Sequence, residues 1–376
     1  MKKYNIATLP GDGVGVEVIA ESIKVLTALQ QHVGGYELDF QHYDVGVVQY
    51  LKAGEVISDN VFNECQKSDA IYLGALGTPN AGMDMVVDKN GTEVTGHAMF
   101  KIRFGLDLFA GVRPIQLWPG VPSALAGHDK IDFIILRENT EGLFASYGGG
   151  TILKDSVATD TQVITREGSE KLFNFAFKLA QDRTGRLGEG RLSDGKKAVT
   201  CAHKGNVFRT FAFFKKIFGE VAQKYQDQVI EDYAIVDALA LWMLQNPENY
   251  DIIVMENMHG DILSDMAAAF VGGMGMAPSG DIGLNHAMFQ PSHGTAPTIA
   301  GKGIVNPCAT ILSGKMMLEW LGQRNGDQAM LAAAKLLEES IYNTFTAGIR
   351  TADIKGNSST AQFGDEIINQ MKKLKV

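Results

Sequence analysis

Two aspartates with helical spacing are the clearest chemical signal in this sequence. Asp261 and Asp265 follow the apolar run 252–255 and stand four residues apart in a segment with a helical pattern. On a helix this interval places both carboxylates on one face, with their Cβ atoms about 5–6 Å apart. Two negative charges this close favour a bound cation, and oxygen ligands suit Mg²⁺ or Mn²⁺ better than zinc. The alternative is a pair of solvated acids in the first turn of a helix, stabilised by the helix dipole.

Asp237 and Lys204 are the next candidates. Asp237 lies in residues 235–242, where nearly every helical position is apolar. An unpaired carboxylate buried in such a helix is costly, so we expect Asp237 to be buried and to bind either a metal ion or a Lys or Arg side chain. Lys204 follows the apolar run 198–201 and is the candidate base, because a nearby divalent cation lowers the pKa of a lysine.

Three arginines stand at positions where α/β proteins could bind an anionic ligand. Arg137 follows the apolar run 133–136, at the carboxyl end of a predicted strand, and Arg103 and Arg113 flank the segment 107–110. Guanidinium groups pair with carboxylates through two parallel hydrogen bonds. Three converging arginines therefore predict a di- or tricarboxylate ligand, although each one taken alone is more often a surface cation.

The glycine-rich segment 11–15 lies between a predicted strand and a predicted helix. A turn of this kind can bring backbone N–H groups close to a phosphate. The dinucleotide fingerprint GxGxxG, however, requires glycine where Val16 stands, and no acidic residue about 20 residues on stands at the end of a convincing second strand. The pattern disfavours a Rossmann site and leaves a simple tight turn or another cofactor-facing loop as alternatives.

Short apolar runs and helical patterns alternate along the chain and would position these residues. Predicted buried strands cover residues 4–9, 70–73, 133–136, 198–201 and 252–255. Predicted helices cover residues 17–30, 167–181, 206–224, 235–245 and 261–271. The alternation predicts a largely parallel α/β sheet with some antiparallel additions, and the polar segment 181–197 reads as a surface loop.

Composition narrows the class of protein. With 376 residues, of which 45% are hydrophobic and 20% charged, the chain can build a large core, and we expect two domains. Asp and Glu outnumber Lys and Arg by 43 to 34, giving a net charge of −9, so neither nucleic acid nor a membrane surface is expected as a partner. The three cysteines lack the spacing of a disulfide framework or a zinc site. Without a signal-peptide or membrane-spanning pattern, we expect a cytoplasmic protein.

Seven motifs, in this order, resemble those of the metal-dependent β-decarboxylating dehydrogenases, the family of isocitrate, homoisocitrate, 3-isopropylmalate and D-malate/tartrate dehydrogenases. They are residues 9–15, Arg103 with Arg113-Pro114, and residues 137–142, 203–206, 236–238, 260–265 and 293–297. The resemblance covers nearly the whole chain. It implies an isocitrate/isopropylmalate dehydrogenase-like two-domain α/β fold distinct from the Rossmann fold. A large domain would comprise residues 1–108 and 272–376, and a small domain residues 109–271.

The resemblance also implies a homodimer with shared active sites and a metal-dependent oxidation. Asp261 and Asp265 would bind Mg²⁺ or Mn²⁺ together with Asp237 of the partner subunit, and Lys204 would act as the base. The reaction would be oxidative decarboxylation of a 2-hydroxy dicarboxylic acid. Family members carry a catalytic tyrosine where this chain has Phe144, and Tyr147 is a candidate substitute. The missing hydroxyl motivates the alternative that the chain is a non-catalytic or regulatory ligand-binding paralogue.

For the cofactor, the resemblance implies NAD, with NADP as the alternative. The nicotinamide end would lie near Leu73 to Thr78. The adenosine would be held by His293, Gly294, Thr295, Ala296, Pro297 and Asn306. Thr298 and Ile299 stand where NAD-using relatives carry an aspartate and many NADP-using ones a lysine followed by a tyrosine. The pair offers no cation for a 2′-phosphate and no carboxylate to repel one.

Substrate choice in the family depends on residues just before the first arginine, which here are His97, Met99 and Phe100. Isocitrate enzymes tend to carry Ser and Asn at the first two of these positions, so a small or apolar C3 substituent is favoured here. The sequence therefore favours 3-isopropylmalate or D-malate/tartrate over isocitrate or homoisocitrate. Other motifs in the chain are closer to the isocitrate and homoisocitrate enzymes, which leaves the individual substrate open.

Overall fold

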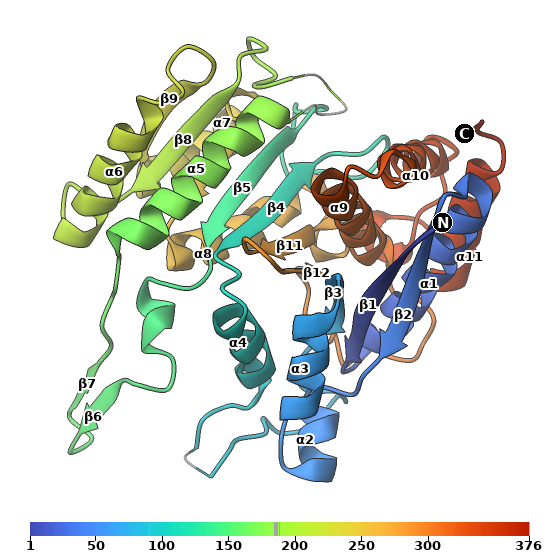
Figure 1. Ribbon diagram of the computed structural model, residues 1–376, viewed down its shortest axis with the longest axis horizontal. Helices are drawn as coiled ribbons and strands as arrows, with labels where there is room; N and C mark the ends of the chain where they lie inside the picture. Colours follow the sequence, from blue (N-terminus) through green and yellow to red (C-terminus); the bar gives the residue numbers. More distant parts are fainter. Residues whose placement is uncertain (90, 184–186, 188, 376) are drawn as a thin grey trace.

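The computed structural model describes residues 1–375 except residues 90, 184–186 and 188. Ten strands form one sheet that crosses the molecule (Figure 1). In spatial order they are β2 (Tyr36–His42), β1 (Lys2–Gly11), β3 (Ala70–Ala75), β12 (Ala287–Pro291), β11 (Pro278–Ile282), β4 (Ala110–Gln116), β5 (Asp132–Glu138), β10 (Ile252–Met255), β8 (Ala198–His203) and β9 (Ile230–Ile235).

The sheet has two parallel halves joined by an antiparallel centre. Strands β2, β1, β3 and β12 are mutually parallel, as are β5, β10, β8 and β9. Between them, β11 pairs antiparallel with both β12 and β4, and β4 pairs antiparallel with β5. The prediction of a mostly parallel sheet with antiparallel additions is confirmed.

Helices cover both faces because the strand residues alternate between them. Ile252 and Val254 of β10 pack in the core beneath α5 (Arg166–Asp182) and α6 (Arg209–Ala222), whereas Ile253 and Met255 pack beneath α7 (Val236–Gln245) and α8 (Asn257–Ala268). The same alternation in β1 and β3 separates two groups of helices. One group is α1 (Val14–Val33), α9 (Cys308–Asn325), α10 (Gln328–Thr346) and α11 (Thr360–Met371); the other is α2 (Val47–Ala53), α3 (Asp59–Lys67) and α4 (Thr95–Gly105).

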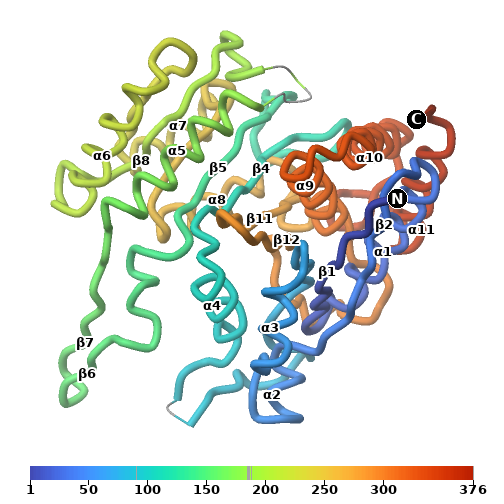
Figure 2. Tube along the Cα trace, viewed as in Figure 1, coloured from blue at the N-terminus to red at the C-terminus, as the bar shows by residue number. Residues whose placement is uncertain are grey.

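Short elements complete the chain. The 3₁₀ turns are η1 (Leu143–Ser146), η2 (Pro247–Asn249), η3 (Ala269–Val271), η4 (Met274–Met276) and η5 (Ala352–Ile354). A separate antiparallel hairpin, β6 (Thr151–Leu153) with β7 (Val157–Thr159), extends away from the body (Figure 2). Within the described residues, no helix is long and apolar enough to cross a membrane.

All five predicted strands and all five predicted helices are present. The strand predicted over 252–255 is found with those limits, and the helix predicted over 261–271 begins earlier, at Asn257. The expected surface loop 181–197 falls partly outside the described residues. The division expected after residues 108 and 271 runs through the sheet centre, where β4 of the expected small domain pairs with β11 of the expected large one.

Candidate active site

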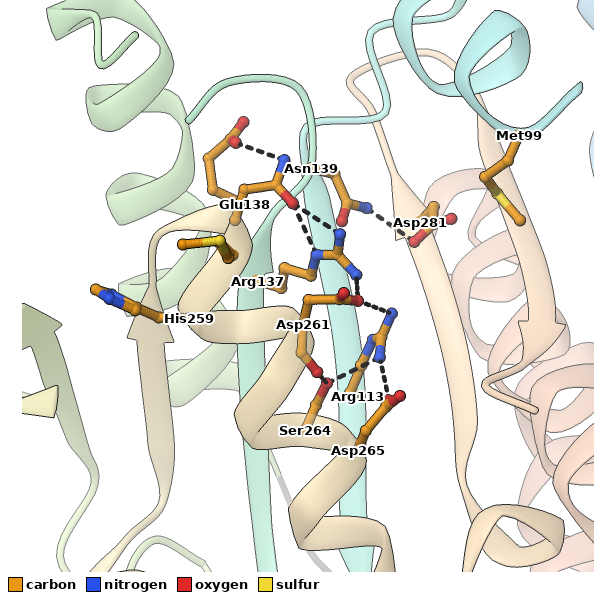
Figure 3. A network of polar contacts seen from close by, with 12 residues as sticks. Met99, Arg113, Arg137, Glu138, Asn139, His259, Asp261, Ser264, Asp265 and Asp281 are labelled. Carbon is orange, nitrogen blue, oxygen red and sulfur yellow. Dashed lines mark hydrogen bonds and ion pairs between the residues drawn. The ribbon is translucent and has the colours of Figure 1, made fainter. Parts of the chain in front are cut away.

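Two of the three predicted metal-binding carboxylates meet two of the arginines in one network. Arg137, near the end of β5, bonds through Nη1 to Oδ1 of Asp261 on α8. Arg113, on β4, donates from Nη1 to Oδ1 of Asp265 at 3.0 Å and to Oγ of Ser264 at 2.8 Å. Figure 3 shows both guanidinium groups directed at these carboxylates. The expected convergence of arginines and acids is therefore present within a single chain.

Helix α8 approaches β5 closely because Gly260 has no side chain. A Cβ built at this position would lie 2.7 Å from Cβ of Arg137. The helix starts at Asn257, where the carboxylate of Glu256 accepts hydrogen bonds from the backbone N–H groups of Met258 (3.1 Å) and His259 (3.4 Å). The glycine and the acidic cap together bring Asp261 to the arginine.

Arg137 is oriented by residues that the sequence did not single out. Oδ1 of Asn257 accepts from Nε (2.9 Å) and Nη2 (2.7 Å) of Arg137. Nδ2 of Asn257 donates in turn to the buried carboxylate of Glu138 at 3.3 Å. Glu138 directly follows Arg137, and Asn257 closely follows the strand 252–255. These positions were the available signal, since polar residues at a strand end are candidates for positioning roles.

Arg103 is buried and has its own carboxylate partner. Its Nε donates to Oδ2 of Asp281 on β11 at 3.0 Å. Burial and the charge of Arg103 lower the pKa of both Arg113 and Arg137, because the three cations lie close together. Asp281 was not among the residues predicted from the sequence. The buried carboxylate in β11 is explained by its ion pair with Arg103, which is 178 residues away in the sequence.

Asp237 differs from expectation. Its carboxylate is exposed and accepts a hydrogen bond from Nζ of Lys204 at 2.5 Å, which lowers the pKa of Asp237. The prediction of a buried Asp237 is wrong because α7 lies at the surface of the chain, with Leu241 and Trp242 also exposed. The predicted pairing with a lysine is found. Across the described part of the chain, no three His, Cys, Asp or Glu side chains are grouped to hold a metal ion.

Aromatic side chains line the approach to Arg137. The ring of Phe144, at the missing-tyrosine position, lies 5.0 Å from the Arg137 guanidinium. Tyr147 instead packs in a tilted arrangement on Phe100 of α4, with ring centroids 4.1 Å apart, and meets His97 edge-on at 5.9 Å. Its buried hydroxyl has no hydrogen-bond partner and lies against the first turn of α4.

Met99, the second of the three predicted specificity residues, also lies on α4. Its sulfur is 3.6 Å from Nε2 of Gln290, which also donates to Asp281. Figure 3 shows Met99 and Asp281 on the same side of the network. The residues expected to read the C3 substituent thus border the arginines.

The predicted cofactor residues come from two loops that are joined by hydrogen bonds. Leu73 is buried in β3, and the loop after that strand contains Thr78, whose carbonyl accepts from the Thr295 hydroxyl at 2.7 Å. His293 keeps a buried Nε2 without a partner. Asn306 donates to Asp353 at 3.1 Å. An unpartnered ring nitrogen in this loop fits a polar ligand group such as the adenosine of a dinucleotide.

The remaining cofactor candidates have mixed surroundings. Gly294 and Thr298 are exposed, whereas Ile299 and Ala296 pack against Val14 and other apolar residues behind the loop; Pro297 lies between them in the turn. Ile299 therefore has a packing role in this structure in addition to its predicted place near the cofactor.

The glycine-rich turn uses its donors within the protein. The N–H of Val14, at the start of α1, donates to the carbonyl of Thr295 at 3.0 Å, and Gly13 contacts the same carbonyl. The carboxylate of Asp12 accepts from the N–H groups of Val47 (2.8 Å), Val48 (2.9 Å) and Gly77 (3.2 Å). Of the two alternatives left open, these contacts favour a tight turn that is bonded to neighbouring segments of the chain.

Comparisons with known proteins agree with this arrangement. The model of the isocitrate/isopropylmalate dehydrogenase family matches residues 5–367. A 3-isopropylmalate/3-methylmalate dehydrogenase of Methanocaldococcus jannaschii is 36% identical over 371 residues, covering 98% of this chain and 99% of that protein. A 3-isopropylmalate dehydrogenase of Corynebacterium kroppenstedtii is 39% identical over 337 residues, covering 88% and 92%. The crystal structure of isocitrate dehydrogenase from Methylococcus capsulatus aligns with a TM-score of 0.81 and 31% identity, covering 99% of this chain and all of that one.

Proposed function

The chain belongs to the isocitrate/isopropylmalate dehydrogenase family and is a decarboxylating oxidoreductase, and we propose that it carries out the NAD-dependent oxidative decarboxylation of a 2-hydroxy dicarboxylic acid with Mg²⁺ or Mn²⁺. One observation carries the proposal. Two aspartates on α8 and three buried arginines meet at one place in the fold. This combination provides oxygen ligands for a divalent cation beside anion-binding side chains.

The donor set fits a divalent cation. The side chains of Asp261 and Asp265 are 42% and 53% exposed, so a cation and water can reach them. Burial and the charge of Asp261 raise the pKa of Asp265 although Arg113 opposes this, because burial and a like charge both disfavour the ionised carboxylate. Asp261 and Asp265 would hold the metal, with Asp237 of the partner subunit as a third ligand. When bound, the metal supplies Lewis-acid stabilisation of negative charge on the substrate oxygen.

The protein's own residues account for binding and proton transfer. Arg103, Arg113 and Arg137 bind the substrate carboxylates. Lys204 would take the C2 hydroxyl proton, and bound NAD would supply the acceptor for the C2 hydrogen and its two electrons, which would leave a β-keto acid. The bond between C3 and the β-carboxyl carbon then breaks, CO₂ leaves, and the remaining enolate takes up a proton at C3. Phe144 has no proton to give at this last step.

We assign the cofactor as NAD because Thr298 and Ile299 offer no cation for a 2′-phosphate. Thr298 is neutral and Ile299 is apolar, and Asp353, bonded to Asn306, adds a negative charge beside the loop. A dianionic phosphate there would lack a charge-assisted partner. Comparison of kcat/KM for the two cofactors tests this: we expect the value for NAD to be higher, and an equal or higher value for NADP would contradict the assignment.

A homodimer with shared active sites would complete the metal site. Asp237 shares one face of α7 with Leu241 and Leu244, both of which are exposed in the single chain. The hairpin β6–β7 is a two-stranded sheet with exposed Ile152 and Leu153, and such hairpins are marginal in isolation. Covering both surfaces with a second copy would place Lys204 and Asp237 against Asp261 and Asp265 of the partner subunit.

The substrate class follows from the side chains next to the arginines. Met99, Phe100 and Phe144 form an apolar border, which suits a small or apolar group on C3. Relatives are named for 3-isopropylmalate and 3-methylmalate, whose C3 groups are alkyl. These substrates and D-malate or tartrate are therefore favoured over isocitrate and homoisocitrate.

Two other functions are less well supported. A non-catalytic paralogue is suggested by Phe144, but Lys204 and the three aspartates are all retained. A phosphoryl-transfer enzyme would need a phosphate loop with a lysine, and the sequence has no such motif.

The proposal is tested by NADH formation with 3-isopropylmalate, 3-methylmalate, D-malate, tartrate and isocitrate, each with Mn²⁺ and with EDTA. We expect Mn²⁺-dependent oxidation of at least one dicarboxylate. Asp261→Asn should lower that rate by several orders of magnitude without unfolding the chain, and Asp44→Asn, at an exposed site on the same chain, should leave it unchanged. Full activity in EDTA would exclude the metal assignment, and no oxidation of any substrate would favour the non-catalytic paralogue.

A further inference from the structure

Asp281 occupies the centre of the sheet beside the three arginines. In the strand register it pairs with Gly111 of β4, which pairs in turn with Arg137 of β5. Its side chain is fully buried, and Oδ1 accepts a hydrogen bond from Nδ2 of Asn139 at 2.8 Å. Asn139 lies over Gly111, where a Cβ would be 2.8 Å from its Oδ1. Asp281 and Arg137 thus lie in the same row of cross-strand neighbours, two strands apart, with the carboxamide of Asn139 between them.

The main partner of Asp281 is a cation. Its Oδ2 accepts from Nε of Arg103 (3.0 Å) and from Nε2 of Gln290 (3.0 Å). Arg103 and Asp281 are both almost completely shielded from water, so their charges act on each other with little screening. The negative charge of Asp281 therefore offsets the positive charge that Arg103 presents to a ligand.

Three arginines and three carboxylates pair within this chain. Arg103 pairs with Asp281, Arg113 with Asp265 and, at 3.9 Å, with Asp261, and Arg137 with Asp261. The six side chains together are neutral, and the separate pair of Lys204 with Asp237 is neutral as well. The two positive charges of a bound divalent cation then match the two carboxylates of a dicarboxylate. A third carboxylate would face Met99 and the aromatic rings with no positive charge to balance it.

We propose that Asp281 is a specificity-determining residue, which offsets the charge of Arg103 so that the site accepts 2-hydroxy dicarboxylates with a neutral C3 substituent and rejects tricarboxylates. This rests on the proposed function, because it concerns the substrate of that same site. Proteins often reject a wrong ligand by placing a charge of the same sign next to it. An unbalanced charge in a buried site costs more binding free energy than an added contact gains.

The test compares wild type with Asp281→Asn, using isocitrate as the tricarboxylate and 3-isopropylmalate as the dicarboxylate. We expect the ratio of kcat/KM for isocitrate to that for 3-isopropylmalate to rise about tenfold or more in the variant, because Arg103 regains its full charge. Calorimetric binding of both acids without cofactor should change in the same direction. Asn139→Ala is the matched control: it removes a neutral hydrogen bond to Asp281 and should change both kcat/KM values in the same proportion.

The substrate preference of the wild-type enzyme is a second test, and it needs no variant. It should prefer the dicarboxylate by about 100-fold or more in kcat/KM. Equal use of isocitrate by the wild type, or an unchanged ratio in a folded Asp281→Asn enzyme, would overturn the role of Asp281 while leaving the proposed reaction intact. If no acid is oxidised, the proposed function fails instead, and calorimetry alone decides whether Asp281 discriminates between the two ligands.

Discussion

The contact between Phe144 and Arg137 concerns the second half of the proposed reaction, in which the enolate is protonated. A phenyl ring over the guanidinium supplies a cation–π contact but no acidic proton. Tyr147 keeps its hydroxyl against α4. Protonation of the enolate therefore depends on Lys204 or water, whereas hydride transfer does not involve this position.

We expect Phe144→Tyr to increase decarboxylation relative to oxidation, since a positioned acid typically contributes about 10²–10⁴-fold. The measurement is the ratio of CO₂ to NADH formed, together with the rate of each. Tyr147→Phe serves as the comparison, and we expect it to have the smaller effect. If Phe144→Tyr altered neither the ratio nor the rates, another group would already supply the proton.

Glu138 links ionisation to stability behind the arginines. Burial raises the pKa of Glu138 to about 7, from 4.5, although its carboxylate accepts hydrogen bonds from Thr140, Glu141 and Asn257. In the unfolded chain Glu138 ionises near its usual pKa, so between pH 4.5 and 7 the folded state binds more protons than the unfolded state. Stability from this residue is therefore greatest at low pH and falls as the pH rises through this window.

We expect the free energy of unfolding of the wild type relative to Glu138→Gln to fall by about 3 kcal/mol between pH 4.5 and 7, because one pKa unit corresponds to about 1.4 kcal/mol. Urea unfolding of both proteins at pH 4.5, 6 and 7 measures this difference. A constant difference would mean that folding leaves the pKa of Glu138 unchanged, and a difference that grows with pH would mean that folding lowers it; either result would contradict this account.

At the scale of elements, the Asp12 carboxylate joins three segments. It ties the turn after β1 to the start of α2, through Val47 and Val48, and to the loop after β3, through Gly77. The loop at Thr78 is bonded in turn to Thr295 of the other cofactor loop. Asp12 therefore positions both loops that the proposed NAD site requires.

We expect Asp12→Asn to raise KM for NAD about tenfold while changing KM for the dicarboxylate much less, because an amide nitrogen cannot accept the N–H groups that now reach the carboxylate. Initial rates with each substrate varied in turn measure the two constants. Asp39→Asn, at a partly exposed position on β2, is the control and should leave both unchanged. Equal increases in both KM values would indicate general loosening of the fold.

The elements also show where sequence patterns were sufficient. The strand β10 is a short run of four buried apolar residues, and its limits could be predicted because nothing in it competes with burial. In contrast, β11 contains Ser279 and Asp281, both buried, and no local pattern identifies it as a strand. Its polar side chains are explained by distant partners such as Arg103, and such contacts become visible only when the fold brings the segments together.

At the scale of the whole molecule, a single chain leaves parts of the predicted site apart. Lys204 and Asp237 pair with each other, whereas Asp261 and Asp265 pair with arginines. Patterning selected Lys204 and the three aspartates as candidate base and metal ligands, but it placed Asp237 in a buried helix, whereas its side chain is exposed. The apolar residues of α7 indicated that this helix is buried. They did not indicate whether the helix packs against its own chain or against a second copy.

Complementation between two inactive variants tests the central claim, that each active site combines Asp261 and Asp265 of one subunit with Lys204 and Asp237 of the other. Asp261→Asn and Lys204→Met chains, co-expressed with different tags and purified through both, give heterodimers in which one site is intact and the other is doubly defective. We expect these heterodimers to have about half of the wild-type activity in NADH formation, since one of two sites is restored. Heterodimers of Asp261→Asn with Asp265→Asn are the control and should stay inactive, because both sites remain damaged. Asp261→Asn and Lys204→Met heterodimers as inactive as their parent homodimers would contradict the shared site.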